Sequence, residues 1–140
     1  MALKQKVLGA EVLFVCGKSP EGHEYDVLFH SHEKGFKNVE AIKLPKHLQI
    51  HTAIRDARIL RKLINDFKPD IIHSHMKNAH FLSFLAMRKS KPPLSVQSCY
   101  DPEGPGNDIR SRILNKHFSD GLVVINSTAK KKAIQIFGFL

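Results

Sequence analysis

Two histidines at alternate positions, His73 and His75, have the clearest chemical potential in this sequence. They end a short apolar run, and alternate residues of a strand point to the same face of a sheet. Imidazole exchanges protons near neutral pH, so the pair could contact a ligand, hold a metal, or pack in the core and cap a loop. No third metal ligand stands at a recognisable spacing, and we therefore predict no metal site.

Other polar residues follow the same run and two later ones. In open parallel sheets, ligands bind beyond the carboxyl ends of the strands, where neighbouring strand ends meet. We therefore add five residues as candidate ligand contacts: Lys77, Asn78, Ser98, Tyr100 and Ser127. Together with the two histidines they make up the predicted site.

Familiar phosphate-binding loops are not recognisable. The segment Gly17-Lys18-Ser19 suggests a P-loop, but that motif would require glycine at the position of Val12. No GxGxxG follows any expected strand. The sequence therefore gives no sign that this chain binds nucleotide phosphates by such a loop.

The elements that must position these residues alternate between short β-branched runs and helical patterns, which is typical of βαβ units around a parallel sheet. We expect strands at 11–16, 38–44, 70–75, 94–98 and 122–125, and helices at 25–34, 54–67, 79–88, 108–118 and 127–137. For the helix over 108–118, we expect Asp108 as the cap and Ile109, Ile113, Leu114 and Phe118 on the inner face.

Basic residues occupy the expected outer faces of two helices. These residues are Arg55, Arg58, Arg61 and Lys62 on one helix and Arg110, Arg112 and Lys116 on the other. The 140 residues contain 22 Lys and Arg against 13 Asp and Glu, for a formal charge of +9. Such a charge favours phosphate-bearing partners, although solvated helix faces explain the same pattern.

The length suits a single domain, residues 1–140, with enough apolar residues for a core. No apolar run approaches the roughly 20 residues of a membrane-spanning helix, and the first residues lack the apolar core of a secretory signal. We expect a cytoplasmic chain.

Three segments, in order, resemble one enzyme family. Lys68–His75 reads KPDIIHSH and is similar to a strand with the pattern Lys/Arg-Pro-Asp, two hydrophobic residues and His-x-His. Ser119–Ser127 reads SDGLVVINS and resembles an Ala-Asp-x strand that ends in Ser. Ala2–Cys16 resembles the end of a helix leading into a second strand. Together they resemble the N-terminal half of family 4 glycosyltransferases of the GT-B type, over nearly the whole chain.

The resemblance implies a Rossmann-like fold, with a mostly parallel sheet and helices on both faces. It also implies that this chain is a partial domain, because the family's first strand and its glycine-rich turn would precede Ala2. In a sheet of order 3-2-1-4-5 that strand is central. We therefore expect the strands over 11–16 and 70–75 either to pair directly or to leave the sheet split.

The function implied is a retaining transfer of a sugar from a nucleotide-sugar donor to a saccharide or lipid-linked acceptor, as in the synthesis of cell-envelope polysaccharides. Acceptor contacts would come from the seven candidate residues, with no resident cofactor or metal. The family's E-x7-E donor motif cannot be present, since the last glutamate is Glu103. We therefore expect the chain to be inactive alone, without a C-terminal domain or a partner chain that completes the cleft.

No catalytic residue is assigned. Many members carry His or Arg after the strand over 94–98, where this chain has Ser98-Cys99-Tyr100. The alternative function is a non-catalytic basic module that binds anionic lipid, as at the inner face of a membrane, or nucleic acid. The lack of a recognition-helix motif and of clustered aromatic residues disfavours nucleic acid.

Overall fold

The computed structural model describes residues 2–17, 31, 33–44, 49–87 and 93–138. The elements, in chain order, are α1 (Ala2–Val7), β1 (Leu13–Gly17), β2 (Lys37–Ile42), α3 (Ile50–Phe67), β3 (Ile71–Ser74), α4 (Lys77–Met87), β4 (Leu94–Cys99), α5 (Ile109–His117), β5 (Gly121–Val124) and α6 (Ser127–Phe137). The helix expected at 25–34 falls almost wholly outside the described residues. The other expected elements occur, with ends that differ by a few residues.

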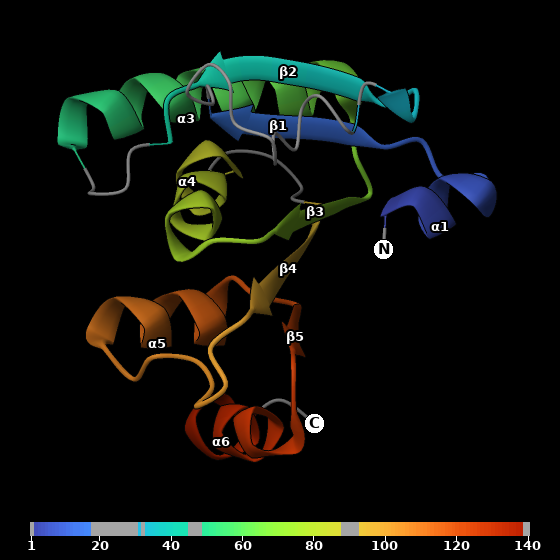
Figure 1. Cartoon of the computed structure of the whole chain (residues 1–140). Coiled ribbons are helices and arrows are strands. Elements are labelled where there is room, and N and C mark those ends of the chain that lie inside the picture. Colours follow the sequence, from blue (N-terminus) through green and yellow to red (C-terminus); the bar gives the residue numbers. More distant parts are fainter. Residues whose placement is uncertain (1, 18–30, 32, 45–48, 88–92, 139–140) are drawn as a thin grey trace.

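The strands form two separate parallel sheets (Figure 1). One contains β1 and β2, and the other has the order β3-β4-β5. The α/β class with parallel pairing is therefore confirmed. Of the two expected outcomes for the strands over 11–16 and 70–75, the split sheet is correct, because within the described ranges β1 pairs only with β2 and β3 only with β4.

Helices α3 and α4 join the two sheets through one apolar cluster. Its buried members are Ile42 from β2, Ala57 and Leu60 from α3, and Leu82 and Ala86 from α4. A buried Leu contributes about 2 kcal/mol through the area that it removes from water. The packing of α3 on α4 therefore connects the β1–β2 sheet to the three-stranded sheet.

Arg61 was expected on the outer face of α3, but its side chain contacts α4. Its guanidinium donates to the backbone oxygens of Leu85 and Ala86, at 2.9 and 2.8 Å. These carbonyls belong to the last residues described in α4. The helical period placed Arg61 outside, but its long side chain reaches back to the neighbouring helix, whereas Arg55, Arg58 and Lys62 are exposed.

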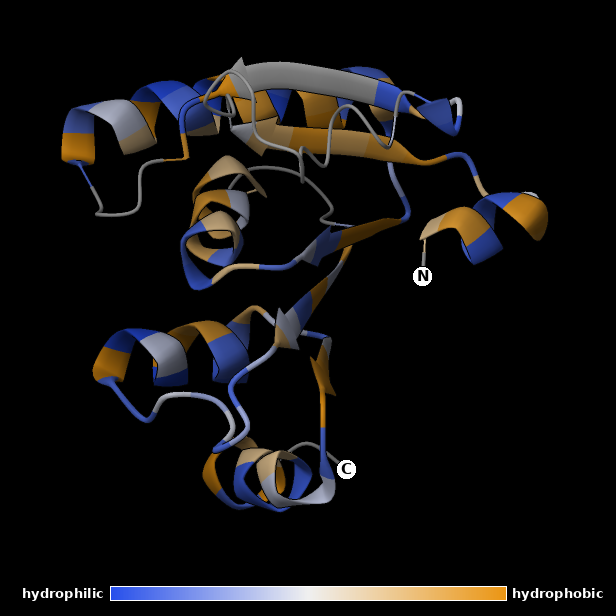
Figure 2. Cartoon of the chain, in the orientation of Figure 1, coloured by the Kyte–Doolittle hydropathy of each residue, from blue (hydrophilic) through white to orange (hydrophobic). Residues whose placement is uncertain are grey.

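The two faces of the three-stranded sheet differ. Ser74, Ser95, Gln97 and Cys99 point to the face on which α4 and α5 lie, and all four are buried. The opposite face presents large apolar side chains to solvent within the described structure: Ile71, Leu94 and Val123 are 55%, 55% and 39% exposed. Figure 2 shows the apolar character of β3 and β5.

The inner face of α5 was predicted incorrectly in part. Leu114 is buried as expected, but Ile109 and Ile113 are 78% and 51% exposed. The side that faces the sheet carries Ser111 and Asn115 instead. Asn115 donates to the Ser111 backbone oxygen at 2.9 Å, and the Ser111 hydroxyl donates to the Asp108 carboxylate, so both buried side chains have partners.

Both C-terminal helices have side-chain caps. Asp108 caps α5 as predicted, accepting from the Ser111 N–H at 3.0 Å. Helix α6 starts at Ser127 but its cap is Asn126, whose Oδ1 accepts from the Ala129 N–H at 2.7 Å. Within the described ranges, no helix has the length and apolar character needed to cross a membrane.

Candidate functional site

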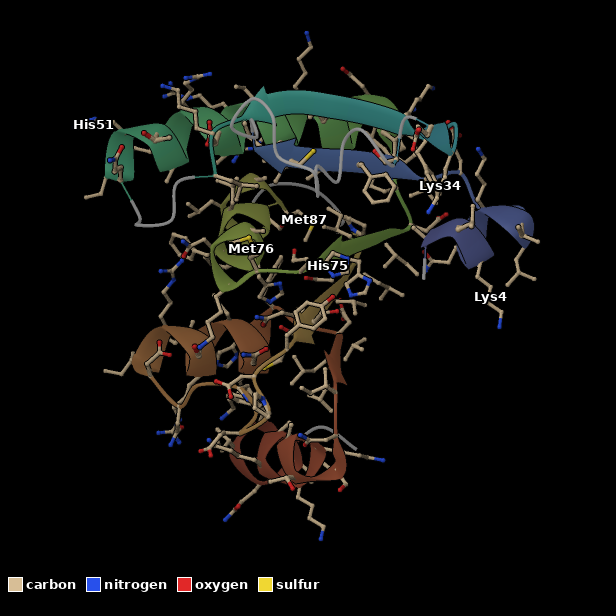
Figure 3. All side chains as sticks on the ribbon, in the orientation of Figure 1. Lys4, Lys34, His51, His75, Met76 and Met87 are labelled. Atoms are coloured by element: carbon tan, nitrogen blue, oxygen red, sulfur yellow. The ribbon has the colours of Figure 1, made fainter. Side chains whose placement is uncertain are left out.

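Strand register brings the predicted histidines next to β4. His73 lies opposite Val96, and Ser98, two residues further along β4, lies opposite Val123 of β5. Because side chains alternate along strands, His73, Ser98 and Val123 share the face that lacks α4 and α5. His75 follows directly after β3, and Figure 3 labels it beside β3 and β4.

Four of the predicted site residues form one hydrogen-bonded cluster, which we call the His/Tyr cluster: His73, His75, Ser98 and Tyr100. His73 Nε2 lies 2.8 Å from Ser98 Oγ, and His75 Nδ1 lies 2.7 Å from the Tyr100 hydroxyl. The two imidazoles are stacked with centroids 4.4 Å apart, and the Tyr100 ring lies 6.1 Å beyond His75 at a small interplanar angle of 17°. The strand ends therefore present a short aromatic stack with a polar edge.

Both imidazoles are held neutral near pH 7. Partial removal from water lowers the pKa of His73, and the charge of neighbouring His75 lowers it further. Removal from water is also the main cause that lowers the pKa of His75. A neutral imidazole has one donor and one acceptor nitrogen, so each ring can bond a partner of either kind.

The cluster spans a buried and an exposed part. Ser98 is buried, His73 is half-buried, and Tyr100 is 59% exposed. An incoming hydroxyl-rich molecule would therefore meet Tyr100 and His75 first, with His73 and Ser98 behind them. Hydroxyl groups can both donate to and accept from such groups, and an exposed aromatic ring provides apolar contact area.

Lys77 and Asn78 point elsewhere. Asn78 Oδ1 accepts from the Arg110 guanidinium at 3.5 Å, and that guanidinium lies 4.0 Å from the Phe81 ring centroid. Lys77 Nζ lies close to Gly106, and its charge contributes to lowering the pKa of Asp108. These two residues therefore connect α4 to the start of α5, and Arg110 is not a free outer cation.

Ser127 is exposed in the first turn of α6. The residue before it, which the sequence did not single out as a site residue, has the larger structural role. Asn126 donates from Nδ2 to the Pro102 backbone oxygen at 3.0 Å while its Oδ1 caps α6. It therefore connects α6 to the segment that follows Tyr100. In the sequence, the feature that could have indicated this role is an Asn directly after a β-branched run.

His80 is a third histidine, and sequence reasoning did not single it out. It is fully buried in α4, where Nε2 lies 2.7 Å from Ser119 Oγ and the ring packs on Phe118 with centroids 5.1 Å apart. Burial lowers the pKa of His80 to about 4. This histidine is a packed, neutral core residue that joins α4 to the segment before β5.

Metal ligands do not gather in the described part of the chain. No three His, Cys, Asp or Glu side chains lie in an arrangement that could hold an ion there. What the His/Tyr cluster offers is hydrogen bonding and an aromatic surface.

Comparison with known proteins gives one match. The model of Glycosyltransferase Family 4 matches residues 2–139. No curated protein and no solved structure matches the chain.

Proposed function

The chain belongs to glycosyltransferase family 4, and from this premise we propose that it is the acceptor-side domain of a retaining glycosyltransferase. The donor is a nucleotide sugar and the acceptor is a saccharide or a lipid-linked saccharide of the cell envelope. The observation that carries the proposal is the His/Tyr cluster at the carboxyl ends of β3 and β4, which is the edge where parallel sheets bind ligands.

The cluster suits an acceptor because it recognises hydroxyl groups without supplying charge. Two neutral imidazoles, a phenol and a serine hydroxyl match the donors and acceptors of a sugar ring. Tyr100 and His75 would hold the acceptor, and His73 would fix the orientation of His75 by stacking on it. Holding the reacting hydroxyl in place lowers the entropic part of the barrier.

The chemical step itself needs groups beyond these. Departure of a nucleoside diphosphate requires cations or helix amino ends directed at its phosphates. The His/Tyr cluster contains no such group, so the proposal assigns donor binding to a C-terminal domain or a partner chain. The 140-residue chain alone is then expected to bind acceptor but to transfer no sugar.

Membrane association is the second candidate function. It is favoured by the exposed cations Arg55, Arg58 and Lys62 of α3, which share one helix. Each basic residue near an anionic bilayer contributes about 1 kcal/mol, and salt weakens the effect. Such a surface would bring the domain to lipid-linked acceptors on the cytoplasmic side of a membrane.

The test of the acceptor site is direct binding. Methyl glycosides of common hexoses and octyl glucoside are titrated into isotopically labelled chain while the histidine side-chain NMR signals are followed. We expect at least one glycoside to shift the signals of His73 and His75, and Tyr100→Ala to weaken its binding about tenfold, since a stacked ring and a hydroxyl partner are lost.

Two controls accompany this titration. Ile109→Ala removes an exposed apolar side chain of α5 and should leave glycoside binding intact. A nucleotide sugar such as UDP-glucose should leave the His73 and His75 signals unchanged. If no glycoside moves these signals, or if Tyr100→Ala binds as the unmodified chain does, the proposed acceptor site is wrong.

A further inference from the structure

An open hollow of about 670 Å³ lies between α5 and α6. Figure 1 shows the two helices as neighbours at one end of the molecule. No residue of the His/Tyr cluster lines the hollow. Its polar lining comes from Asn107, Arg112, Thr128, Lys131, Lys132 and Gln135.

The lining is strongly positive. Arg112, Lys131 and Lys132 supply three cationic side chains, and no lining residue is acidic. Among the described residues, none of the three forms an ion pair with a carboxylate. The nearest acid along the chain, Asp108, is exposed, and its carboxylate accepts from the backbone N–H and the hydroxyl group of Ser111.

The amino end of α6 adds to this charge, whereas the amino end of α5 is already capped by the Asp108 carboxylate. Arg112 lies in the first turn of α5, and Thr128 lies in the first turn of α6. Helix amino ends carry a partial positive charge, which favours an anion placed near them. Thr128, Asn107 and Gln135 add neutral groups that can donate hydrogen bonds to anionic oxygens.

We propose that the hollow between α5 and α6 is a binding site for a phosphate group. Phosphate has several strong acceptor oxygens and up to two negative charges, which matches three convergent cations better than a single carboxylate would. Its source is either a lipid head group or a soluble phosphate compound. The proposal does not depend on acceptor binding at the His/Tyr cluster.

Calorimetric titration with inorganic phosphate and with pyrophosphate, at constant ionic strength, tests the site. The variant is Arg112→Gln with Lys131→Gln and Lys132→Gln. The matched control, called the surface control, replaces three exposed cations outside the hollow, Lys4, Lys34 and Lys43, by Gln, and so removes the same charge elsewhere. Circular dichroism and thermal melting establish that both variants fold.

We expect saturable binding by the unmodified chain, binding weakened at least about tenfold in the α5–α6 variant, and near-unmodified binding in the surface control. Equal weakening in both variants would mean that total charge, not the hollow, attracts the anion. Absence of saturable binding in the unmodified chain would equally overturn the proposal.

Vesicles then identify the source of the phosphate. Phosphatidylcholine vesicles containing phosphatidic acid carry an accessible phosphomonoester. If the site takes a lipid head group, the α5–α6 variant sediments with them less than the surface control does. If it takes a soluble compound, the two variants sediment alike while their affinities for inorganic phosphate still differ.

Discussion

His73 Nε2 and Ser98 Oγ lie 2.8 Å apart, from neighbouring strands and 25 residues apart in the chain. The bond fixes the imidazole plane on which His75 stacks. A buried serine hydroxyl therefore sets the orientation of the exposed end of the His/Tyr cluster. Replacing either partner should disturb the site before it disturbs the fold.

The pKa values of His73 and His75 are coupled. Part of the lowering of the His73 pKa comes from the charge of His75, so His75→Gln should raise the His73 pKa toward its ordinary value. Titration of the imidazole carbon protons by NMR measures this. Lys62→Gln, on an exposed part of α3, should leave the His73 pKa where it is, and an unchanged His73 pKa in His75→Gln would contradict the coupling.

His80 makes stability depend on pH. Its pKa is about 4 in the folded chain and about 6.5 when unfolded, so the unfolded state binds the proton first. Stability from this residue is complete above about pH 6.5 and falls by about 2 to 3 kcal/mol as pH drops to 4.

Urea unfolding at several pH values between 7 and 4 measures the loss. His80→Gln cannot titrate but can still bond Ser119, so its free energy of unfolding should change less over this interval. His73 and His75 contribute equally in both proteins and cancel in the comparison. Identical pH profiles would show that His80 is not the group responsible.

Asp56 anchors the end of β2. It is 1% exposed in α3, and its Oδ2 accepts from the backbone N–H groups of Lys43 and Leu44, at 3.0 and 3.2 Å. Asp56→Ala leaves both donors without this partner and should lower the free energy of unfolding by about 2 to 4 kcal/mol. Asp66→Ala, at an exposed position of the same helix, should change it by less than about 0.5 kcal/mol.

The split sheet predicts self-association. Strands β1 and β3 each pair with a single strand in the described structure, and an unpaired edge is a template for another chain. Ile71→Lys places a charge on the exposed face of edge strand β3 and should reduce concentration-dependent association, measured by light scattering. Ile109→Lys, which removes a still more exposed isoleucine from α5, should not.

Much of this fold is visible in the sequence because each strand is a compact β-branched run between turn residues. The run ending in His73-Ser74-His75 is an example, and its period of two placed both histidines on one face correctly. Contacts between strands follow from that placement and from parallel pairing. The His73–Ser98 and His75–Tyr100 pairs are therefore within reach of sequence reasoning.

Periodicity fails where a side chain bridges to another element. Arg61 has an outward helical position but bonds two carbonyls of α4, and Ile109 has an inward pattern but no sheet beside it. His80 was missed because one histidine in an apolar helix gives no pattern; its partner Ser119 is 39 residues away. Such polar pairs between distant residues depend on how the whole chain packs, and no local sequence pattern indicates them.

The contact between α3 and α4 also determines how the chain unfolds. No strand-to-strand hydrogen bond in the described residues crosses from one sheet to the other, so the Arg61 bonds and the apolar cluster carry the mechanical connection. Loosening them would let the β1–β2 block open while β3–β5 stay paired. The chain should then unfold as two cooperative blocks, with amide hydrogens of β1 and β2 exchanging earlier than those of β4.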